Sequence, residues 1–434
     1  MIFIYNFFIH LYFLLIKSAS FFNAKAAAWI EGRERLFDDL ERQVKGSKKI
    51  IWVHCSSAGE FEQGKPVIEA LKSNYPSHRI LVSFFSPSGF KVAGNYKHCD
   101  WICYIPLDTR SNAKRFLNLV NPELVIFIKY EFWYHLLSQA AARKIPVLLV
   151  SAVFRKDQLF FKAIGKSYKK FLYLFKTIIV QDKASLELLH RHNITHAFTG
   201  GDTRFDRVAE LAKTEIDLPF IDLFRSNKKL LVAGSTWPGD EKLLQQWLTE
   251  NPGWKLLIAP HEIDPDHIES IKKLFPGCML YSILSKSEKA AISMKGIWAN
   301  VSREETDALK KMLVNANVLV IDNVGMLSRL YYYADASYVG GGFTKDGIHN
   351  VLEPAAFGKP VFFGTNYKKY REAGELIAAG GGFSVADAQE MQEFFREENH
   401  LIAAGNAATS YVIDNKGAVN KVMHYIQENR LLTS

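Results

Sequence analysis

Short apolar runs alternate with helix-length segments along almost the whole chain. The runs are rich in β-branched and aromatic residues, and polar residues do not alternate with apolar ones within them. They cover residues 49–55, 79–85, 101–106, 123–130, 147–154, 177–182, 229–235, 255–260, 317–323, 336–342 and 360–364. Near-continuous strands of this kind are typical of parallel sheets that helices cover on both faces. The sequence therefore predicts an α/β fold with two doubly wound, Rossmann-like domains.

A break in this rhythm predicts the domain boundary. Residues 213–226 interrupt the alternation. We expect an N-terminal segment at 1–22, a first domain at 23–212 and a second at 213–434, and leave open whether the last helix packs back on the first domain. Because ligands of such sheets bind beyond the carboxyl ends of the strands, the motifs below are expected to converge on one cleft that the two domains face.

The composition restricts the partners of the chain. Over 434 residues, 54 Lys and Arg against 45 Asp and Glu give a formal net charge of +9, which favours an anionic partner such as phosphate, a membrane surface or nucleic acid. Nucleic acid is disfavoured, because no aromatic-plus-basic RNA signature and no zinc-finger spacing is present. The four cysteines form no CxxC pair and no disulfide framework, so reduced thiols in the cytosol are the simple interpretation.

The first sixteen residues, MIFIYNFFIHLYFLLI, carry no charged side chain. The run falls just short of the roughly 17–25 residues of a membrane-spanning helix, so it is a marginal membrane anchor. No basic residue precedes it, which disfavours a secretory signal peptide. The basic residues that follow, beginning at Lys17, would keep the rest of the chain in the cytoplasm. The alternative is a helix that packs on the globular domain.

One carboxylate stands where the first predicted strand passes to a helix. In SSAGE, residues 56–60, two serines and a glycine allow a tight turn, and a helix is expected from Phe61. Glu60 would then lie at the carboxyl edge of the sheet, beside the unpaired N–H groups of the helix N-terminus. A carboxylate that merely stabilises the helix N-terminus would occupy the same position.

A glycine-rich stretch, GGGFTKDGIHNVLEPAAFGKPVFFG at 340–364, is the candidate nucleotide site. Three glycines after a strand allow a ligand to approach the backbone, and a helix expected from Asn350 to Phe357 would present its N-terminus to a phosphate. Glu353 is placed to accept both hydroxyls of a ribose. Neither GxGxxG nor a Walker loop is present. A purely structural glycine loop is the alternative.

Five segments carry a resemblance to a known family: WVHCSSAGE (52–60), YIPLD (104–108), EFW (131–133), GDTRFD (201–206) and GGFTKDGIHNVLEP (341–354). In order and spacing they resemble the landmarks of the Kdo transferases, which add 3-deoxy-D-manno-oct-2-ulosonic acid to the inner core of lipopolysaccharide. The resemblance implies a GT-B architecture of two Rossmann-like domains and an anchor in the inner membrane, with the catalytic domains in the cytoplasm. It also implies CMP-Kdo as donor, a lipid A precursor (lipid IVA) as acceptor, and an inverting transfer without a bound metal or cofactor.

The resemblance also assigns roles to individual residues. Glu60 matches the family's GE motif and is the candidate base for the attacking hydroxyl, and Glu131 matches a second glutamate that helps to place a substrate. Arg204 matches a cation near the donor's phosphate or carboxylate. The other donor-site candidates are Ser235, His261, Gly325, Gly341, Gly342, Asn350 and Glu353, and the acceptor- or sugar-site candidates are Ser57, Gly59, Ser86, Ser88 and Gly89. For SPSG at 86–89, a plain strand-ending turn is the alternative.

The chain departs from the family pattern at several positions. Lys129 and Tyr134 replace a glutamate and a proline around Glu131. The usual P-R-H stretch is APHEIDPDH at 259–267, so an arginine is missing and His261 is the candidate substitute. Further replacements flank the candidate nucleotide contacts, at Ile348, Val351, Thr365 and Asn366.

A second candidate for membrane contact is LFFKAIGKSYKKFLYLFK at 159–176. Its five lysines accompany Phe160, Phe161, Ile164, Phe171 and Phe175 in one helix-length segment. Basic, aromatic amphipathic helices lie in anionic membrane interfaces, here the inner leaflet. Lysines that snorkel from an ordinary core helix would give the same pattern.

Two other functions stay open on the sequence alone. One is a different enzyme of the same two-domain plan that uses a UDP-sugar, such as a hexosaminyltransferase or an epimerase. The other is a non-catalytic, membrane-bound nucleotide-binding protein in which Glu60 only stabilises its helix. A nucleotide-binding comparison and a transfer assay separate these possibilities.

Overall fold

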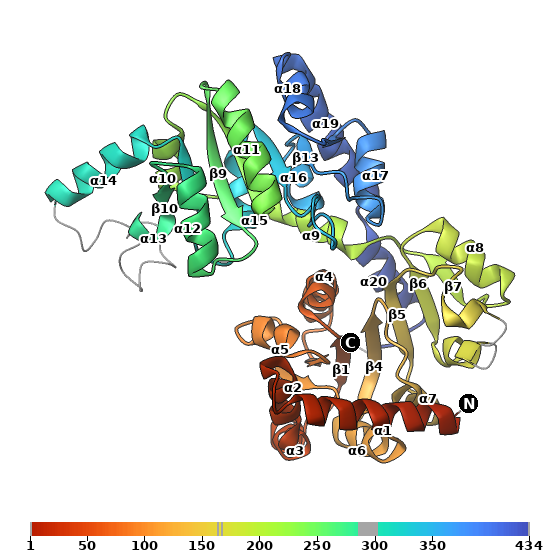
Figure 1. Cartoon of the computed structure of the whole chain (residues 1–434). Coiled ribbons are helices and arrows are strands. Elements are labelled where there is room, and N and C mark those ends of the chain that lie inside the picture. Colours follow the sequence, from red (N-terminus) through yellow and green to blue (C-terminus); the bar gives the residue numbers. More distant parts are fainter. Residues whose placement is uncertain (1, 163–164, 166–167, 285–302, 433–434) are drawn as a thin grey trace. The chain divides into compact units, whose positions relative to one another are not determined.

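The computed structural model describes residues 2–162, 165, 168–284 and 303–432, and Figure 1 shows the whole chain. The chain divides into two compact units. The first comprises Met1–Arg207 and Asn415–Ser434, and the second Val208–Asp414. Each unit contains one seven-stranded sheet in which all neighbouring strands are parallel. The predicted α/β fold with two Rossmann-like domains is therefore confirmed.

The first sheet has the strand order β3-β2-β1-β4-β5-β6-β7. Its order reverses direction between β1 and β4, which places the loops after these two strands at a topological switch point, where doubly wound sheets bind ligands. The strands are β1 Ile50–Cys55, β2 Arg79–Phe84, β3 Trp101–Tyr104, β4 Pro122–Ile128, β5 Val147–Ala152, β6 Thr177–Val180 and β7 Ala197–Thr199.

The second sheet repeats this plan with the order β10-β11-β9-β8-β12-β13-β14. Its switch point lies between β8 and β12. The strands are β8 Lys229–Thr236, β9 Trp254–Pro260, β10 Met279–Leu280, β11 Val318–Val320, β12 Ala336–Val339, β13 Val361–Phe363 and β14 Gly382–Ser384.

Three strands, β7, β10 and β14, were not predicted from the sequence. Each lies at an edge of its sheet and contains only two or three residues. Strands β11 and β13 also contain only three residues, but each lies in one of the predicted apolar runs. The three edge strands lie outside these runs, and a neighbouring parallel strand supplies their hydrogen-bond partners. Each of the eleven apolar runs coincides with one strand to within a few residues at either end.

Helices follow most strands. In the first unit they are α1 Ile2–Ala19, α2 Ala24–Glu34, α3 Leu36–Val44, α4 Ala58–Asn74, α5 Pro87–Ala93, α6 Arg110–Val120, α7 Tyr134–Ala142, η1 Leu159–Phe161, η3 Tyr168–Leu174, α8 Lys183–Arg191 and α20 Ala418–Glu428, and α9 Thr203–Leu211 crosses into the second. In the second unit they are α10 Pro219–Arg225, α11 Pro238–Glu250, α12 Pro265–Leu274, α13 Tyr281–Leu284, α14 Arg303–Asn315, α15 Leu327–Leu330, η6 Tyr331–Tyr333, α16 Leu352–Ala356, α17 Arg371–Ala378, α18 Ala388–Phe395 and α19 Glu398–Asn415.

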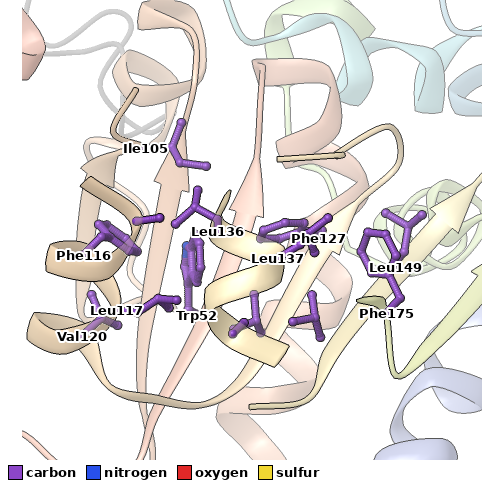
Figure 2. Close-up of a cluster of buried hydrophobic side chains, with 14 of the residues drawn as sticks. Trp52, Ile105, Phe116, Leu117, Val120, Phe127, Leu136, Leu137, Leu149 and Phe175 are labelled. Atoms are coloured by element: carbon purple, nitrogen blue, oxygen red, sulfur yellow. The ribbon is translucent and has the colours of Figure 1, made fainter. Parts of the chain in front are cut away.

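Both faces of the first sheet are buried, as its uninterrupted apolar strands require. On one face Trp52 packs against Phe116 of α6 and Phe127 of β4 (Figure 2). On the other face Val53 shares a core with residues of α4 and of the C-terminal helix α20. Successive residues of β1 thus enter two different cores.

The segment 159–176 does not form the single amphipathic helix expected of it. Its described residues form the two short 3-10 helices η1 and η3. Phe175 is buried in the core of the first unit, and Phe160 and Phe161 pack against the same core. Phe171 is also buried, beside the rings of Tyr5 and Tyr134. Ile164 and Lys166 lie outside the described residues. The aromatic face of the described part therefore serves the core, which favours the alternative of lysines on an ordinary core segment.

Trp52 offers a direct test of this packing. We expect Trp52→Ala to destabilise the first unit by about 3–5 kcal/mol, because the indole is fully buried and its removal leaves a cavity. Hydrogen exchange of the full chain should show the loss of protection in β1, β4 and α6, while the second unit keeps its protection. Trp52→Phe should cost clearly less. A loss below about 1 kcal/mol, the scale of a surface substitution, would contradict the packing described.

Candidate active site

The turn after β1 holds Glu60 at the carboxyl edge of the first sheet. The helix α4 begins at Ala58, not at Phe61 as predicted, because Ser57 serves as its N-cap. Glu60 therefore lies in the first turn of the helix. The Ser57 hydroxyl donates a 2.7 Å hydrogen bond to the Glu60 carboxylate and accepts a 3.5 Å bond from the Glu60 backbone N–H. This reciprocal pair holds a partly exposed carboxylate just beyond the strand.

The turn after β2 packs directly against the turn after β1. The backbone N–H groups of Phe85 and Ser86 donate to the Ser56 carbonyl at 3.2 and 2.8 Å, and Ser86 caps α5. A Cβ atom on Gly89 would lie 3.1 Å from the backbone carbonyl carbon of Ser57, so glycine allows this close approach. The structure thus brings together all the predicted acceptor- or sugar-site residues: Ser57, Gly59, Ser86, Ser88 and Gly89.

Glu131 follows β4 and is almost fully buried. Its Oε2 atom lies 3.1 Å from Nε2 of His54 in β1 and accepts a bond from the indole N–H of Trp133. On the other side of the imidazole, the Ser83 hydroxyl lies 2.8 Å from Nδ1 and accepts the indole N–H of Trp52 at 2.7 Å. With the imidazole proton on Nε2, the Trp52 indole donates to the Ser83 hydroxyl and that hydroxyl donates to Nδ1 of His54. The His54 Nε2–H group then donates to Glu131. The carboxylate is therefore fixed in position.

The two acids of this edge have different surroundings. Burial opposes ionisation of Glu131, but the His54 imidazole and hydrogen bonds from Ser56 and Trp133 outweigh it and lower the pKa of this carboxyl. Burial, together with the charges of Glu60 and Glu131, raises the pKa of the Cys55 thiol. The ends of β1 and β4 thus bring both predicted catalytic acids to one place, one buried and fixed, the other partly exposed.

Arg204 joins the same edge through its neighbour Asp202. Its Nε and Nη2 atoms both donate to the Asp202 carboxylate, at 2.9 and 2.8 Å. The buried Asp202 also accepts a 3.3 Å bond from the Gln63 side chain, and the Thr203 hydroxyl donates to the Gln63 carbonyl at 2.6 Å. The start of α9 is therefore attached to α4 one turn beyond Glu60.

In the second unit, the loop after β12 is fastened to the start of α11. The buried carboxylate of Asp240 accepts 2.9 Å bonds from the N–H groups of Gly341 and Trp237 and from the Tyr338 hydroxyl. Gly341 has a φ of 94°, and a Cβ atom there would lie 2.4 Å from the Gly347 carbonyl oxygen. This position therefore requires glycine.

Two donor-site candidates are hydrogen-bonded to each other after this loop. The Asn350 amide donates to the Glu353 carboxylate at 3.1 Å, and its oxygen accepts the Leu352 N–H at 3.1 Å. The helix α16 covers only Leu352–Ala356 and is shorter than the predicted 350–357. The Asn350 side-chain oxygen accepts the Leu352 N–H in place of a backbone carbonyl, so the helix begins after Asn350.

His261, the residue considered for the missing arginine, lies in an aromatic stack. Its ring centroid is 4.9 Å from that of Trp237 and 4.4 Å from that of His349. Burial and the neighbouring His261 lower the pKa of His349 to about 4, with Asp346 acting in the opposite direction. His349 is therefore neutral at pH 7, and ring surfaces occupy this part of the sheet edge.

The remaining donor-site candidates lie in loops of the same sheet edge. Ser235 has a φ of 54° where the pairing of β8 with β9 shifts register, and Gly325 has a φ of 96° after β11. A Cβ atom on Gly342 would lie 2.4 Å from the Cα atom of Gly364. Asn366, one of the departures from the family pattern, donates its backbone N–H to the Gly342 carbonyl at 2.9 Å. All predicted donor-site residues of this unit therefore follow or end its parallel strands.

His54, Trp237 and Asp240 belong to these sites but are not among the residues predicted from the sequence. His54 lies within an apolar strand, and a buried ionisable side chain there is a signal that could have identified it. Trp237 and Asp240 lie at the start of α11, and an acidic residue such as Asp240 is common in the first turn of any helix. Among the described residues, no group of three or more His, Cys, Asp and Glu side chains is arranged to hold a metal ion.

The fold is similar to solved structures of two-domain sugar-nucleotide enzymes. A UDP-GlcNAc 2-epimerase from Neisseria meningitidis bound to UDP-GlcNAc is 15% identical, with a TM-score of 0.58 over 88% of this chain and 100% of that chain. A glycosyltransferase from Rickettsia africae is 13% identical, with a TM-score of 0.51 over 88% of this chain and 98% of that chain. At these identities the likeness concerns the fold, which is the GT-B fold of glycosyltransferases and epimerases.

The sequence comparisons point to one family. Residues 31–207 match the family model described as 3-deoxy-D-manno-octulosonic-acid transferase, or Kdo transferase. The 3-deoxy-D-manno-octulosonic acid transferase of Aquifex aeolicus is 26% identical over 81% of this chain and 86% of its own length, and that of Haemophilus influenzae 25% over 87% and 86%. The comparisons confirm the resemblance drawn from the motifs: the chain is similar to the Kdo transferases, a family of glycosyltransferases.

His349 predicts a pH dependence of stability. Its pKa is about 4 in the folded chain and about 6.5 in an unfolded one, so the unfolded chain binds the proton first as the pH falls. The free energy of unfolding should therefore decrease between about pH 6.5 and 4, by on the order of 1 kcal/mol after allowance for partial exposure. Melting temperatures of the full chain should fall less steeply over this range in His349→Gln. If the melting temperatures of the unmodified chain and of His349→Gln fell equally with pH, His349 would not be the cause of the pH dependence.

Proposed function

We propose that the chain transfers Kdo from CMP-Kdo to a lipid A precursor, lipid IVA, with inversion and without a bound metal. The observation that carries the proposal is the pair of acids at one sheet edge, Glu60 partly exposed and Glu131 buried. The family supplies the reaction class, and the related proteins named above are Kdo transferases. CMP-Kdo and lipid IVA follow from the motif resemblance.

In the proposed reaction, an acceptor hydroxyl attacks the anomeric carbon of Kdo. Glu60 takes the proton of that hydroxyl, the new C–O bond forms, and the bond to the phosphate of CMP breaks with its electron pair on the phosphate oxygen. Ser57 holds the Glu60 carboxylate for this step. Glu131 is better suited to positioning, because three hydrogen-bond partners already hold its buried carboxylate.

The donor is proposed to bind at the sheet edge of the second unit. Gly341 and Gly342 let the loop after β12 pack closely on Gly347 and Gly364. Beside this loop, Asn350 with Glu353 offers amide and carboxylate groups to a ribose. Arg204 supplies positive charge toward the leaving phosphate or the sugar carboxylate. That both sheet edges meet over the substrates in one cleft stays a prediction.

We further propose that the protein acts on the cytoplasmic face of the inner membrane. One described helix, α1, is long and apolar enough to cross a bilayer, by length and composition. A lipid-linked acceptor resides in a membrane, so an apolar helix on the first unit fits the proposed substrate.

A transfer assay with purified protein, CMP-Kdo and lipid IVA, followed by mass analysis of the lipid, tests the proposal. Glu60→Gln should lower the rate by about 10²–10⁴-fold, because the amide cannot accept the proton. Glu62→Gln is the matched control: it lies two residues further along α4, is 47% exposed and pairs with Lys65. Unaltered transfer by Glu60→Gln would remove Glu60 from the mechanism.

Nucleotide binding separates the proposed enzyme from a UDP-sugar enzyme. CMP should raise the melting temperature of the full chain more than UDP at equal concentration. Asn350→Ala should weaken CMP binding by about fivefold, the scale of one hydrogen bond. A larger stabilisation by UDP would favour the UDP-sugar alternative, and CMP binding by a chain that transfers nothing would favour a non-catalytic nucleotide-binding protein.

A further inference from the structure

The N-terminal helix α1 is fastened to the first unit by polar contacts. The Tyr5 hydroxyl donates a 2.5 Å bond to the Asp108 carboxylate and accepts a 3.3 Å bond from the Tyr134 N–H. Asn6 Oδ1 lies 2.6 Å from Nε2 of His135. Asp108 is fully buried, so lifting α1 away would deprive a buried carboxyl of a hydrogen-bond donor, which is costly. The helix therefore lies along one side of the first unit (Figure 1).

An apolar groove lies between α1 and the body of the first unit, beside the points where the two are in contact. A second attachment lies further along the helix, where the Tyr12 ring is 6.0 Å from that of Phe85 and 6.1 Å from that of Trp29. The groove has a volume of about 600 Å³, and none of the described residues that line it carries a charge. Phe8, Leu11, Leu15 and three other α1 residues form one wall, and Phe85 and Trp133 form the other.

The groove runs from the apolar outer surface of α1 toward the edge of the first sheet where Glu60 and Glu131 lie. Phe8 and Leu15 are 58% and 61% exposed and belong both to the groove and to the apolar outer surface of α1. On the inner side, Trp133 lines the groove with its ring while its N–H is bonded to Glu131. Phe85 immediately precedes the Ser86 turn. A molecule in the groove would therefore extend from the outer surface of α1 to the site of the two acids.

We infer that this groove holds one hydrocarbon chain of the lipid acceptor and so positions the acceptor sugar beside Glu60 and Glu131. Walls without charge favour an uncharged occupant. An extended peptide would bring backbone N–H and C=O groups that such walls leave unsatisfied, whereas an acyl chain brings none. Because the outer surface of α1 is itself apolar, the chain can enter from a bilayer. The identity of the acceptor rests on the proposed function, but the binding of a hydrocarbon chain does not.

Photolabelling of the full chain with a diazirine analogue of palmitic acid tests the groove without any transfer assay. Peptide mapping should show saturable labelling of α1 and of the segments that contain Phe85 and Trp133. The helix offers two matched pairs for control. Phe8 and Leu15 line the groove, whereas their neighbours Phe7 and Leu14, 57% and 58% exposed, do not. Each member of a pair should contribute equally to binding at a membrane surface.

Phe8→Gln and Leu15→Gln should each raise the half-saturating concentration of the probe about tenfold, as expected for loss of apolar contact. Phe7→Gln and Leu14→Gln should leave it unchanged. Equal effects within both pairs, labelling that does not saturate, or cross-links through the groove to a second copy of the chain would each overturn the inference.

Kinetics then connects the groove to the acceptor. With tetra-acylated lipid IVA, Leu15→Gln should raise KM about tenfold relative to Leu14→Gln, whereas the two variants should have the same KM for the fully deacylated phosphorylated disaccharide. An equal KM for lipid IVA would contradict an acyl-chain role. If the unmodified chain transfers no Kdo at all, the proposed function fails, and the photolabelling result still decides whether the groove binds a hydrocarbon chain.

Discussion

The buried carboxylate of Glu131 fixes the site of the first unit. It accepts hydrogen bonds from His54 and Trp133, and the charge is stable without solvent because these donors replace water. The His54 contact ties the end of β4 to β1, which leads into the turn of Glu60. Trp133 extends the same arrangement to the groove beneath α1. A change at this one carboxylate would therefore affect the base, the positioning of substrate and the wall of the groove together.

In the second unit, a different buried carboxylate fixes the loops at the sheet edge. Asp240 is also a buried carboxylate, and it holds the glycine loop after β12 to the start of α11 through the N–H of Gly341. In both units a carboxylate that does not contact the proposed reacting atoms positions the loops that would. Glycines then allow the loops to approach each other, as Gly89 does for the first two turns of the first unit. This combination leaves backbone and polar groups at the sheet edge available to a ligand.

Much of the fold could be predicted from the sequence, because eleven strands carry continuous apolar runs and both of their faces are buried. Strands β7, β10 and β14 could not, since each is a two- or three-residue edge strand outside the apolar runs and depends on its neighbour for hydrogen-bond partners. The candidate site divides in the same way. Glu60, Glu131 and Asn350 stand in recognisable motifs, whereas His54 appears in the sequence as one polar residue within a strand. Its part in the site depends on β4 lying beside β1.

The sequence by itself determined the order of eleven strands, the position of the glycine loop and the apolar character of the N-terminal segment, because these properties depend on residues close together in the chain. Tertiary structure decided the rest. Phe160, Phe161 and Phe175 contribute to a core. The helix α1 lies along the first unit because Asp108 and His135, more than one hundred residues away, supply polar partners for Tyr5 and Asn6. Such partners become visible only when the folded chain brings distant segments together, since a buried polar group is stable only where its hydrogen-bond partner lies within reach.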